Sequence, residues 1–361
     1  MLSPAPPDTV AAIADPALPV AVALPATATP LSVDAPALSA PGNRTTRYQV
    51  RHLTRYRYGD RVSVSHHILH LVPRPHPRQV CDDPQIRIVP APAARADWCD
   101  YFGNPTSYCE IREPHLCLEI ESTLQVTVQP PTIDLAATPA WELVRAQTQV
   151  PVDDDDLAAA AMVFDSLLVR ATPDLCDYAR PSFTTDRPIG AAVMDLTRRI
   201  FRDFRFDATA TSVSTPLAEV LNHRRGVCQD FAHLGIGCLR ALGLPARYVS
   251  GYLRTLPPQG RPRLIGADAS HAWFAAWCGP AAGWIDFDPT NDRTADANYI
   301  SIAWGRDYDD VSPVRGVILG GAWHELTVAV DVEPLDELPP PDETADEIRD
   351  EVPAADVAPV P

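Results

Sequence analysis

Arg225-Gly-Val-Cys-Gln-Asp-Phe-Ala-His-Leu234 carries a cysteine at the point where an apolar helical pattern begins. The pattern runs to residue 242 and stops at Gly243, ahead of Pro245. Unpaired N–H groups and the positive end of the dipole at a helix start favour a thiolate over a thiol. The same N–H groups can receive negative charge on a substrate oxygen. Cys228 is therefore predicted to be a nucleophile, although a helix-starting cysteine taken alone is more often a packed small side chain.

A histidine and two carboxylates follow on neighbouring apolar segments. Ser270-His-Ala-Trp-Phe-Ala-Ala-Trp277 places His271 at the start of an expected strand, and Gly283-Trp-Ile-Asp-Phe-Asp-Pro-Thr-Asn291 places carboxylates at the end of the next. If the two strands pair as a hairpin, Asp288 can lie beside His271 and hold its imidazole in one tautomer. The other ring nitrogen can then face the Cys228 thiol, which is the nucleophile, base and orienting carboxylate of covalent catalysis.

Composition limits the class of protein and of partner. The chain has 361 residues, of which 46% are hydrophobic, and it has a net charge of -17 and no lysine. This length leaves room for two domains, and the acidic balance makes nucleic acid and anionic membrane poor partners. None of the eight cysteines forms a Cys-X-X-Cys pair, so structural zinc is not expected. No basic segment precedes the mildly apolar N-terminus, which favours a cytoplasmic location over secretion.

The region before the cysteine motif has two patterns. Residues 45–135 alternate between apolar and polar side chains, most clearly at residues 48–58 and 116–128, with Pro, Gly and Asn in the gaps. This pattern predicts an N-terminal antiparallel β-sandwich. Residues 136–185 contain prolines and the acidic run 153–156, and they are interpreted as a linker and the start of a second domain.

Residues 186–332 contain helical patterns followed by strand patterns. The expected helices lie at residues 189–204, 217–221 and 228–242, and the expected strands at 246–253, 272–277 and 284–287. Strands that adjoin one another after a group of helices indicate an α+β domain. The Ala/Pro-rich leader, residues 1–44, and the acidic Pro-rich tail, residues 333–361, are predicted to be disordered.

The second domain resembles the transglutaminase-like superfamily, which keeps a cysteine, a histidine and an aspartate in that chain order. The matching stretches are Gly226-Val-Cys-Gln-Asp-Phe-Ala-His233, Leu244-Pro-Ala-Arg-Tyr-Val-Ser-Gly-Tyr252, Ser270-His-Ala-Trp273, Gly283-Trp284 and Phe287-Asp-Pro-Thr-Asn291. The resemblance implies that Cys228 is the nucleophile, His271 the general base and acid, and Asp288 the orienting carboxylate. It also implies a papain-like α+β catalytic core.

The resemblance extends upstream to the N-terminal β region of bacterial transglutaminase-like proteins. The stretches similar to it are Tyr48-Gln-Val-Arg-His-Leu-Thr-Arg-Tyr-Arg-Tyr58, Leu71-Val-Pro-Arg-Pro75 and Asp100-Tyr-Phe-Gly-Asn104. Together the matches span roughly residues 46–330. One departure is Asp286, a second carboxylate on the same strand face as Asp288, which could compete for His271. Asp288 is preferred because it belongs to the Phe-Asp-Pro-Thr motif.

Four further residues are candidates to line the substrate cleft: Gln229, Asp230, Tyr252 and Trp273. Gln229 and Asp230 follow the nucleophile, although an aspartate at a helix start also has a structural reason to be there. Trp273 could form a wall for the acyl group, and Tyr252 matches the family pattern. Both aromatic residues are ordinarily packing residues in strands.

The predicted reaction is attack by Cys228 on an amide carbonyl, which gives a thioester that water then resolves. Resemblance favours hydrolysis of a peptide or isopeptide bond, whereas an amine in place of water would give protein-glutamine transamidation. Members of the family are associated with ATP-grasp-type ligases, so a non-catalytic or accessory role in a peptide-ligating system stays open. No cofactor or metal is expected, because His66, His67 and His70 do not share one strand face.

Overall fold

The computed structural model describes residues 44–255 and 269–335. The predicted leader, residues 1–44, and the predicted tail, residues 333–361, lie almost wholly outside the described residues. Within the described ranges, no helix has both the length and the apolar composition needed to cross a membrane.

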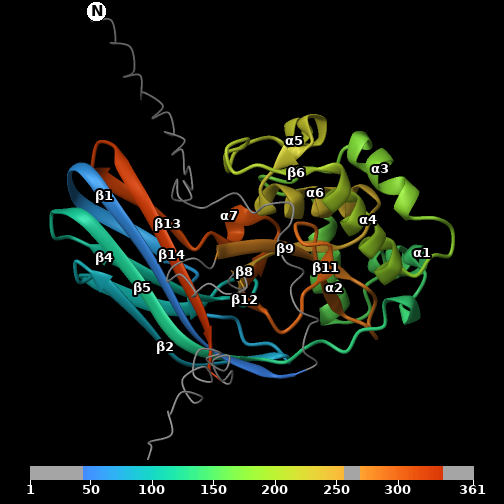
Figure 1. The fold of residues 1–361 in the computed structure, drawn as a ribbon, viewed down its shortest axis with the longest axis horizontal. Helices are drawn as coiled ribbons and strands as arrows, with labels where there is room; N and C mark the ends of the chain where they lie inside the picture. The colour runs from blue at the N-terminus through green and yellow to red at the C-terminus, as the bar shows by residue number, and fades with distance from the viewer. Residues whose placement is uncertain (1–43, 256–268, 336–361) are drawn as a thin grey trace, which may run out of the picture.

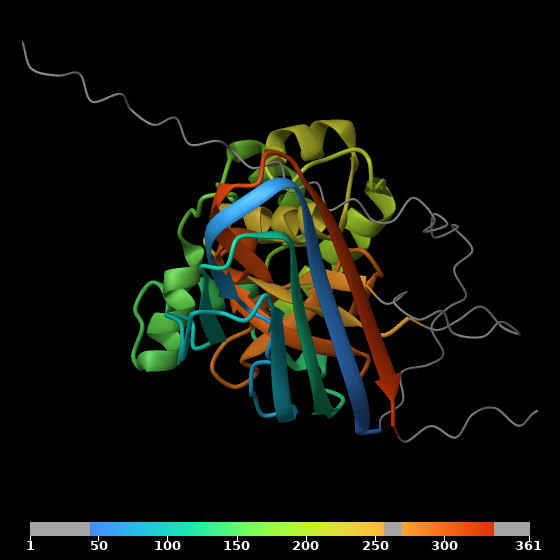
Figure 2. The same ribbon diagram turned by 90° about the vertical axis from the view of Figure 1, so that its left-hand side faces the viewer.

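Seven strands form one antiparallel sheet that curls around its longest member. They are β1 (Thr46–Leu69), β2 (Gln79–Val89), β3 (Ala94–Cys99), β4 (Pro105–Ile111), β5 (His115–Val128), β13 (Val314–Gly320) and β14 (His324–Pro334). The order is β2-β5-β1-β4-β3, and β13 and β14 also pair with β1. The first part of β1 pairs with β5 and β14, and its last part pairs with β4 and β13. Figure 2 shows β14 in red running beside β1 in blue.

The burial pattern of β1 shows that one face of this sheet is covered and the other is partly open to solvent. Tyr48, Val50 and His52 are buried, and the residues between them are only partly buried, as expected for a strand with one covered face. Leu118 and Ile120 of β5 are fully buried in the core inside the curl. The alternation seen in the sequence therefore corresponds to real strands, and the predicted antiparallel β region is confirmed.

A second antiparallel sheet of five strands carries the predicted catalytic histidine and aspartate. Its order is β11-β10-β9-β8-β12. Its strands are β8 (Ala246–Leu253), β9 (Ala269–Trp277), β10 (Trp284–Asp288), β11 (Arg293–Thr294) and β12 (Tyr299–Gly305). A short parallel pair, β6 (Arg205–Phe206) and β7 (Arg225–Gly226), lies apart from it. In Figure 1 this sheet lies between the curled sheet and the helices.

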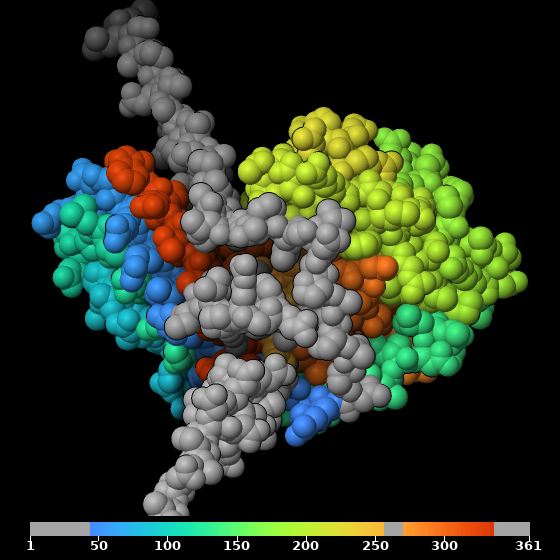
Figure 3. All heavy atoms as spheres, in the orientation of Figure 1, coloured from blue at the N-terminus to red at the C-terminus, as the bar shows by residue number. Residues whose placement is uncertain are grey.

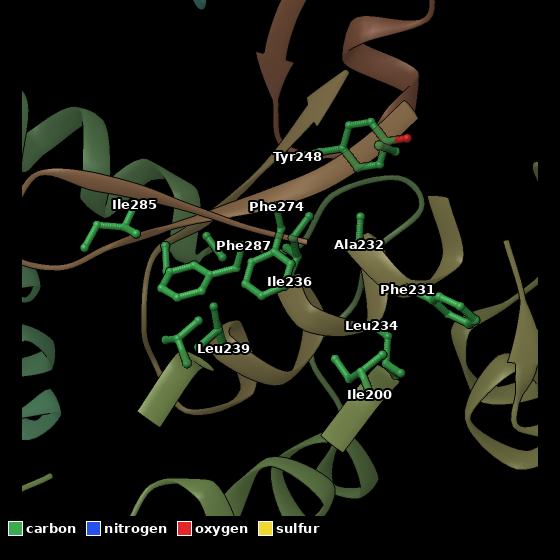
Figure 4. Close-up of a cluster of buried hydrophobic side chains, with 14 of the residues drawn as sticks. Ile200, Phe231, Ala232, Leu234, Ile236, Leu239, Tyr248, Phe274, Ile285 and Phe287 are labelled. Carbon is green, nitrogen blue, oxygen red and sulfur yellow. The ribbon is translucent and has the colours of Figure 1, made fainter. Parts of the chain in front are cut away.

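Helices cover the second sheet. They are α1 (Trp141–Thr148), α2 (Asp154–Ala160), α3 (Pro173–Ala179), α4 (Ile189–Asp203), α5 (Leu217–His223), α6 (Cys228–Ala241) and α7 (Tyr308–Val311), with 3-10 turns η1 (Leu135–Ala137), η2 (Ala161–Val163) and η3 (Arg180–Ser182). A Cβ at Gly235 would lie 2.5 Å from the Phe274 ring, so a glycine lets α6 pack closely on β9. Figure 4 shows Phe274 and Phe287 together with Leu239 of α6 in the buried cluster.

Two predicted boundaries differ from the structure. Residues 136–185, predicted as a linker and the start of the second domain, form α1, α2 and α3, because Val144 and Leu175 are buried in the main core. The predicted second domain ended at residue 332, but β13 and β14 belong to the first sheet. Figure 3 shows these red strands beside the blue and teal ones. The predicted boundary was wrong because β1 also pairs with β13 and β14, which follow the second sheet in the sequence.

Buried hydrogen bonds join the two sheets. The Gln79 side chain donates to the carbonyl oxygens of Ser301 (2.7 Å) and Arg74 (2.9 Å), and it accepts from the Ser301 N–H at 2.9 Å. His52 Nδ1 and the Tyr252 hydroxyl are 2.8 Å apart. The position of the second sheet therefore depends on polar contacts with the first, as well as on apolar packing.

Gln79→Leu should lower the free energy of unfolding by about 2 to 4 kcal/mol, because buried donors and acceptors at Ser301 lose their partners. Chemical denaturation of the purified protein measures the change. Gln85→Leu is the matched control, since Gln85 is exposed and its side chain, among the described residues, hydrogen-bonds only Asp83, at 2.8 Å. Equal stability of the Gln79 variant and wild type would contradict this account of the interface.

Candidate active site

His271 and Asp288 form a close pair on adjacent strands. β9 and β10 pair as an antiparallel hairpin, with Phe274 opposite Phe287. At the ends of this hairpin, His271 Nε2 donates to Asp288 Oδ2 at 2.7 Å. The Asp288 side chain is fully buried and His271 is 8% exposed. The predicted hairpin therefore brings the two side chains together as the sequence indicated.

Three residues outside the predicted set also hold the Asp288 carboxylate. Asn291 Nδ2 and the Tyr299 hydroxyl each donate to Oδ2 at 2.7 Å, and the Thr290 N–H donates to Oδ1 at 2.8 Å. Asn291 ends the Phe-Asp-Pro-Thr-Asn motif, so its position was visible in the sequence. Tyr299 begins β12, and no spacing signal pointed to it.

Cys228 begins α6, and its side chain lies beside the His271 imidazole, whose pKa it helps to raise. Because Asp288 occupies Nε2, the ring nitrogen left for the thiol is Nδ1. Cys228 is half-buried, so it is not sealed in the core. The structure thus gathers the three residues predicted as nucleophile, base and orienting carboxylate at one place.

Asp230 fixes the start of α6 and does not face a cleft. Its Oδ2 accepts from the Val227 N–H at 2.8 Å and from the Thr211 hydroxyl at 2.6 Å. A Cβ at Gly226 would lie 2.6 Å from the same oxygen, which accounts for the glycine ahead of the cysteine. Burial raises the pKa of Asp230, and the bonds from Thr211 and Val227 oppose that rise.

Charge and burial act in opposite directions on His271. Burial disfavours the imidazolium, but the Asp288 charge and hydrogen bonds to Asp288 and Cys228 outweigh it, and the pKa of His271 is raised to about 10. The pKa of Asp288 is lowered, because the His271 charge and the bonds from His271, Asn291 and Tyr299 outweigh its burial. The pair is therefore charged at neutral pH, which places an imidazolium beside the cysteine.

The second carboxylate, Asp286, has a different partner. Its Oδ2 accepts from Arg78 Nη2 at 3.2 Å, across the interface between the sheets. Arg247, whose guanidinium stacks on Trp304 at 3.6 Å from the ring centroid, adds a second positive charge nearby. Asp286 thus belongs to an arginine cluster at the interface, and Asp288 is the carboxylate bonded to His271.

Of the four predicted cleft residues, three are buried in supporting positions. Asp230 and Tyr252 are each 3% exposed and Trp273 is fully buried, so they do not line an open cleft. The Tyr252 hydroxyl bonds His52, and Trp273 packs edge to face on Tyr299. Only Gln229 is partly exposed, and its amide donates to the Val213 carbonyl at 3.3 Å. Strand and helix positions near a nucleophile often serve packing, and three of these four residues do so here, so their substrate-binding roles stay predictions.

Among residues 44–255 and 269–335, no group of three or more His, Cys, Asp or Glu side chains could hold a metal ion. In the predicted His66, His67 and His70 segment, His66 Nδ1 lies 2.7 Å from the Tyr108 hydroxyl and His70 Nδ1 lies 3.0 Å from the Ser312 carbonyl. His66 and His70 thus have separate protein partners.

Comparison with known proteins supports the resemblance in both halves. The family model for the bacterial transglutaminase-like N-terminal region matches residues 48–127, and that for the transglutaminase-like superfamily matches residues 177–289. An uncharacterized protein of Mycobacterium tuberculosis is 43% identical over 307 residues, which cover 83% of this chain and 96% of the relative. A protein-glutamine gamma-glutamyltransferase of Pseudomonas aeruginosa is 41% identical over 68 residues, 19% of this chain and 10% of that protein.

A solved structure has a similar fold. A candidate cysteine protease from Cytophaga hutchinsonii matches with a TM-score of 0.65 and 24% identity, covering 82% of this chain and 93% of that one. At this identity the match shows the fold alone. It confirms the predicted α+β architecture.

Asp288→Asn should lower the pKa of His271, because it removes the charge that offsets burial of the imidazolium and keeps the side-chain size. In wild type the folded-state pKa of about 10 lies above the unfolded value of 6.5. The imidazolium therefore contributes stability that is complete below pH 6.5 and is lost as pH rises toward 10. In the variant most of this pH-dependent loss of stability should disappear; in wild type it amounts to about 5 kcal/mol, at about 1.36 kcal/mol per pKa unit.

Histidine NMR titration and denaturation at several pH values measure these two effects. Asp292→Asn is the control, since it removes a neighbouring charge that pairs with Arg198 at 3.6 Å and not with His271. An ordinary histidine titration for wild-type His271 would refute the charged pair.

Proposed function

The chain belongs to the transglutaminase-like superfamily, a thiol-dependent acyl-transfer family, and on this premise we propose that it hydrolyses a peptide or isopeptide amide bond through a thioester on Cys228. The observation that carries the proposal is the placement of Cys228 beside His271, whose imidazole is hydrogen-bonded to Asp288. The family and this arrangement support acyl transfer by a thiol; the identity of the bond cleaved is the proposed part.

Formation of the thioester needs a thiolate and an acid. With His271 protonated, the Cys228 sulfur attacks the amide carbonyl carbon, and the carbonyl oxygen becomes negatively charged. N–H groups in the first turn of α6 have no partner within the helix, so they can donate to that oxygen. When the C–N bond breaks, the imidazolium of His271 gives its proton to the departing amine, and the sulfur keeps the acyl group.

Resolution of the thioester reverses the proton movement. Neutral His271 removes a proton from water as the water oxygen attacks the thioester carbonyl carbon. The C–S bond then breaks, the carboxylic acid leaves, and the returning thiolate and imidazolium restore the starting state. Asp288 stays ionised throughout and keeps Nε2 of His271 in its bond, so Nδ1 stays directed at the reacting atoms.

Transamidation is the second candidate, and the match to the Pseudomonas aeruginosa gamma-glutamyltransferase supports it. The same thioester would then be attacked by an amine, and the product would be a new amide. The chain has no lysine, so it cannot supply a lysine side chain as its own acceptor. We favour hydrolysis because that match covers only 19% of the chain.

We propose a peptide or protein as substrate, in the cytoplasm, and keep an ATP-grasp-type ligase as a proposed partner. Deletion of residues 335–361 followed by a binding assay with a purified ligase of that class tests the acidic tail as the docking segment. If binding is retained after the deletion, the tail is not the docking segment for the ligase.

Wild type should release products from a peptide library, and Cys228→Ala should lower the rate by at least about 1000-fold. Mass spectrometry with and without an added primary amine reads the outcome. Addition of water across a cleaved amide supports hydrolysis, and incorporation of the amine supports transamidation. Equal product from wild type and the variant would reject catalysis by this cysteine.

Iodoacetamide should alkylate Cys228 at pH 6.5 about tenfold or more faster than Cys117, because Cys228 stands at the start of α6 beside the His271 imidazole. Cys117 is the internal control, since it is also half-buried. His271→Gln should remove the difference, and peptide mapping after timed labelling measures it. Equal rates for the two cysteines in wild type would count against an activated thiol.

A further inference from the structure

An open groove lies far from the proposed chemistry, at the other end of α6. Two adjoining hollows of about 790 and 470 Å³ share Tyr101, Ala161 and Phe164, and we call them together the Tyr101–Phe164 groove. Gly243, two residues beyond α6, lies in its wall. Because α6 has 14 residues, it is about 21 Å long, and Cys228 stands at its opposite end.

Large apolar side chains at the groove are open to solvent. Tyr101 is 87% exposed, Phe164 is 70% exposed and Leu157 is 59% exposed. Single exposed apolar residues are common on proteins, but a gathering of them around a hollow marks a contact site for another molecule. The Tyr101 and Phe102 rings also meet edge to face, 5.1 Å apart, at the tip of the β3–β4 turn.

Buried hydrogen bonds hold the wall formed by α2, η2 and the residues after them. Arg240 of α6, which is 3% exposed, donates to the Met162 carbonyl at 2.9 Å and to the Ser166 hydroxyl at 3.0 Å. The Leu168 N–H donates to Asp307 Oδ2 at 2.8 Å. This wall is therefore formed before any partner arrives.

The opposite wall is held just as firmly. Asn104, which is fully buried next to the β3–β4 turn, donates to the Trp304 carbonyl at 2.9 Å and accepts from the Trp304 N–H at 3.0 Å. Because neither wall has to be ordered on binding, a partner would meet a low entropic cost.

The rim of the groove is acidic. Asp154 and Asp165 line it, and Asp155 is exposed beside Asp154 in the first turn of α2. Arg306 also lines the groove, but Asp310 holds its guanidinium through two bonds of 2.9 Å. The rim therefore presents net negative charge around an apolar floor, which complements a segment with apolar anchors and basic flanks.

We propose that the Tyr101–Phe164 groove is a docking site for a basic, apolar segment of a second protein. The chain's own ends do not match this chemistry: residues 1–43 contain no Lys or Arg, and residues 336–361 have Arg349 alone among many carboxylates. A second copy bound groove to groove would bring two acidic rims together. The proposal does not depend on the chemistry at Cys228.

A peptide-display selection on the full-length chain tests the proposal. Random peptides of about 12 residues are selected on wild type. The enriched peptides are then synthesised with a fluorophore for anisotropy titration. Peptides with aromatic or aliphatic anchors and net positive charge are expected. Phe164→Ser and Tyr101→Ser should each weaken binding at least about tenfold. Asp154→Asn should weaken it about threefold, and its affinity should fall less steeply with added salt than that of wild type, because one rim charge is gone.

Two matched controls separate the groove from other effects. Trp323→Ser removes an apolar side chain that is 65% exposed on the curled sheet, and it should leave affinity unchanged. Cys228→Ala should also bind as wild type does, so a failure of the proposed catalysis would not affect this result. Circular dichroism of each variant checks that the exposed substitutions leave the fold intact.

Three outcomes would overturn the proposal. The first is no enrichment of peptides, or enrichment of peptides that bind Phe164→Ser as well as wild type. The second is enrichment of acidic or uncharged peptides, which would contradict the charge argument. The third is a concentration-dependent dimer that Phe164→Ser abolishes, because the occupant would then be a second copy of this chain.

Discussion

The buried carboxylate of Asp288 is the group on which the site depends. A carboxylate removed from water costs several kcal/mol unless donors surround it, and here Oδ2 accepts from His271, Asn291 and Tyr299 at 2.7 Å each. These bonds keep the carboxylate ionised, and the ionised carboxylate in turn keeps His271 protonated at neutral pH. An imidazolium next to Cys228 is what converts a half-buried cysteine into a candidate nucleophile.

α6 brings the parts of this arrangement into register. Asp230 ties its start to the Val227 N–H, Gly235 lets its middle lie against Phe274, and Arg240 ties its end to the segment before α3. Each contact is buried, so the helix has little freedom to slide or rotate on β9. The thiol is thus fixed relative to His271 at one end, and the groove wall is fixed at the other.

Much of the site could be predicted from sequence because each of its parts has a local signal. A cysteine at a helix start, a histidine opening one strand and a carboxylate closing the next indicated the hairpin, and the motif favoured Asp288 over Asp286. The hydrogen bond from Tyr299 had no such signal, because it crosses from the start of β12 to the end of β10. The exposure of Tyr252 and Trp273 was also misjudged, since apolar strand patterns do not say which face a second sheet covers.

The C-terminal strands show why a boundary drawn from order along the chain failed, and what their real position does. β12 starts at Tyr299, the donor to Asp288, and leads through α7 into β13, which pairs with β1 from Val62 to Leu69. Gln79 bonds both backbone groups of Ser301 in the same strand. The curled sheet therefore holds β12 along its length and at its exit. Because β12 presents the hydroxyl that supports the buried carboxylate, the N-terminal sheet is a structural part of the site and not a separate unit beside it.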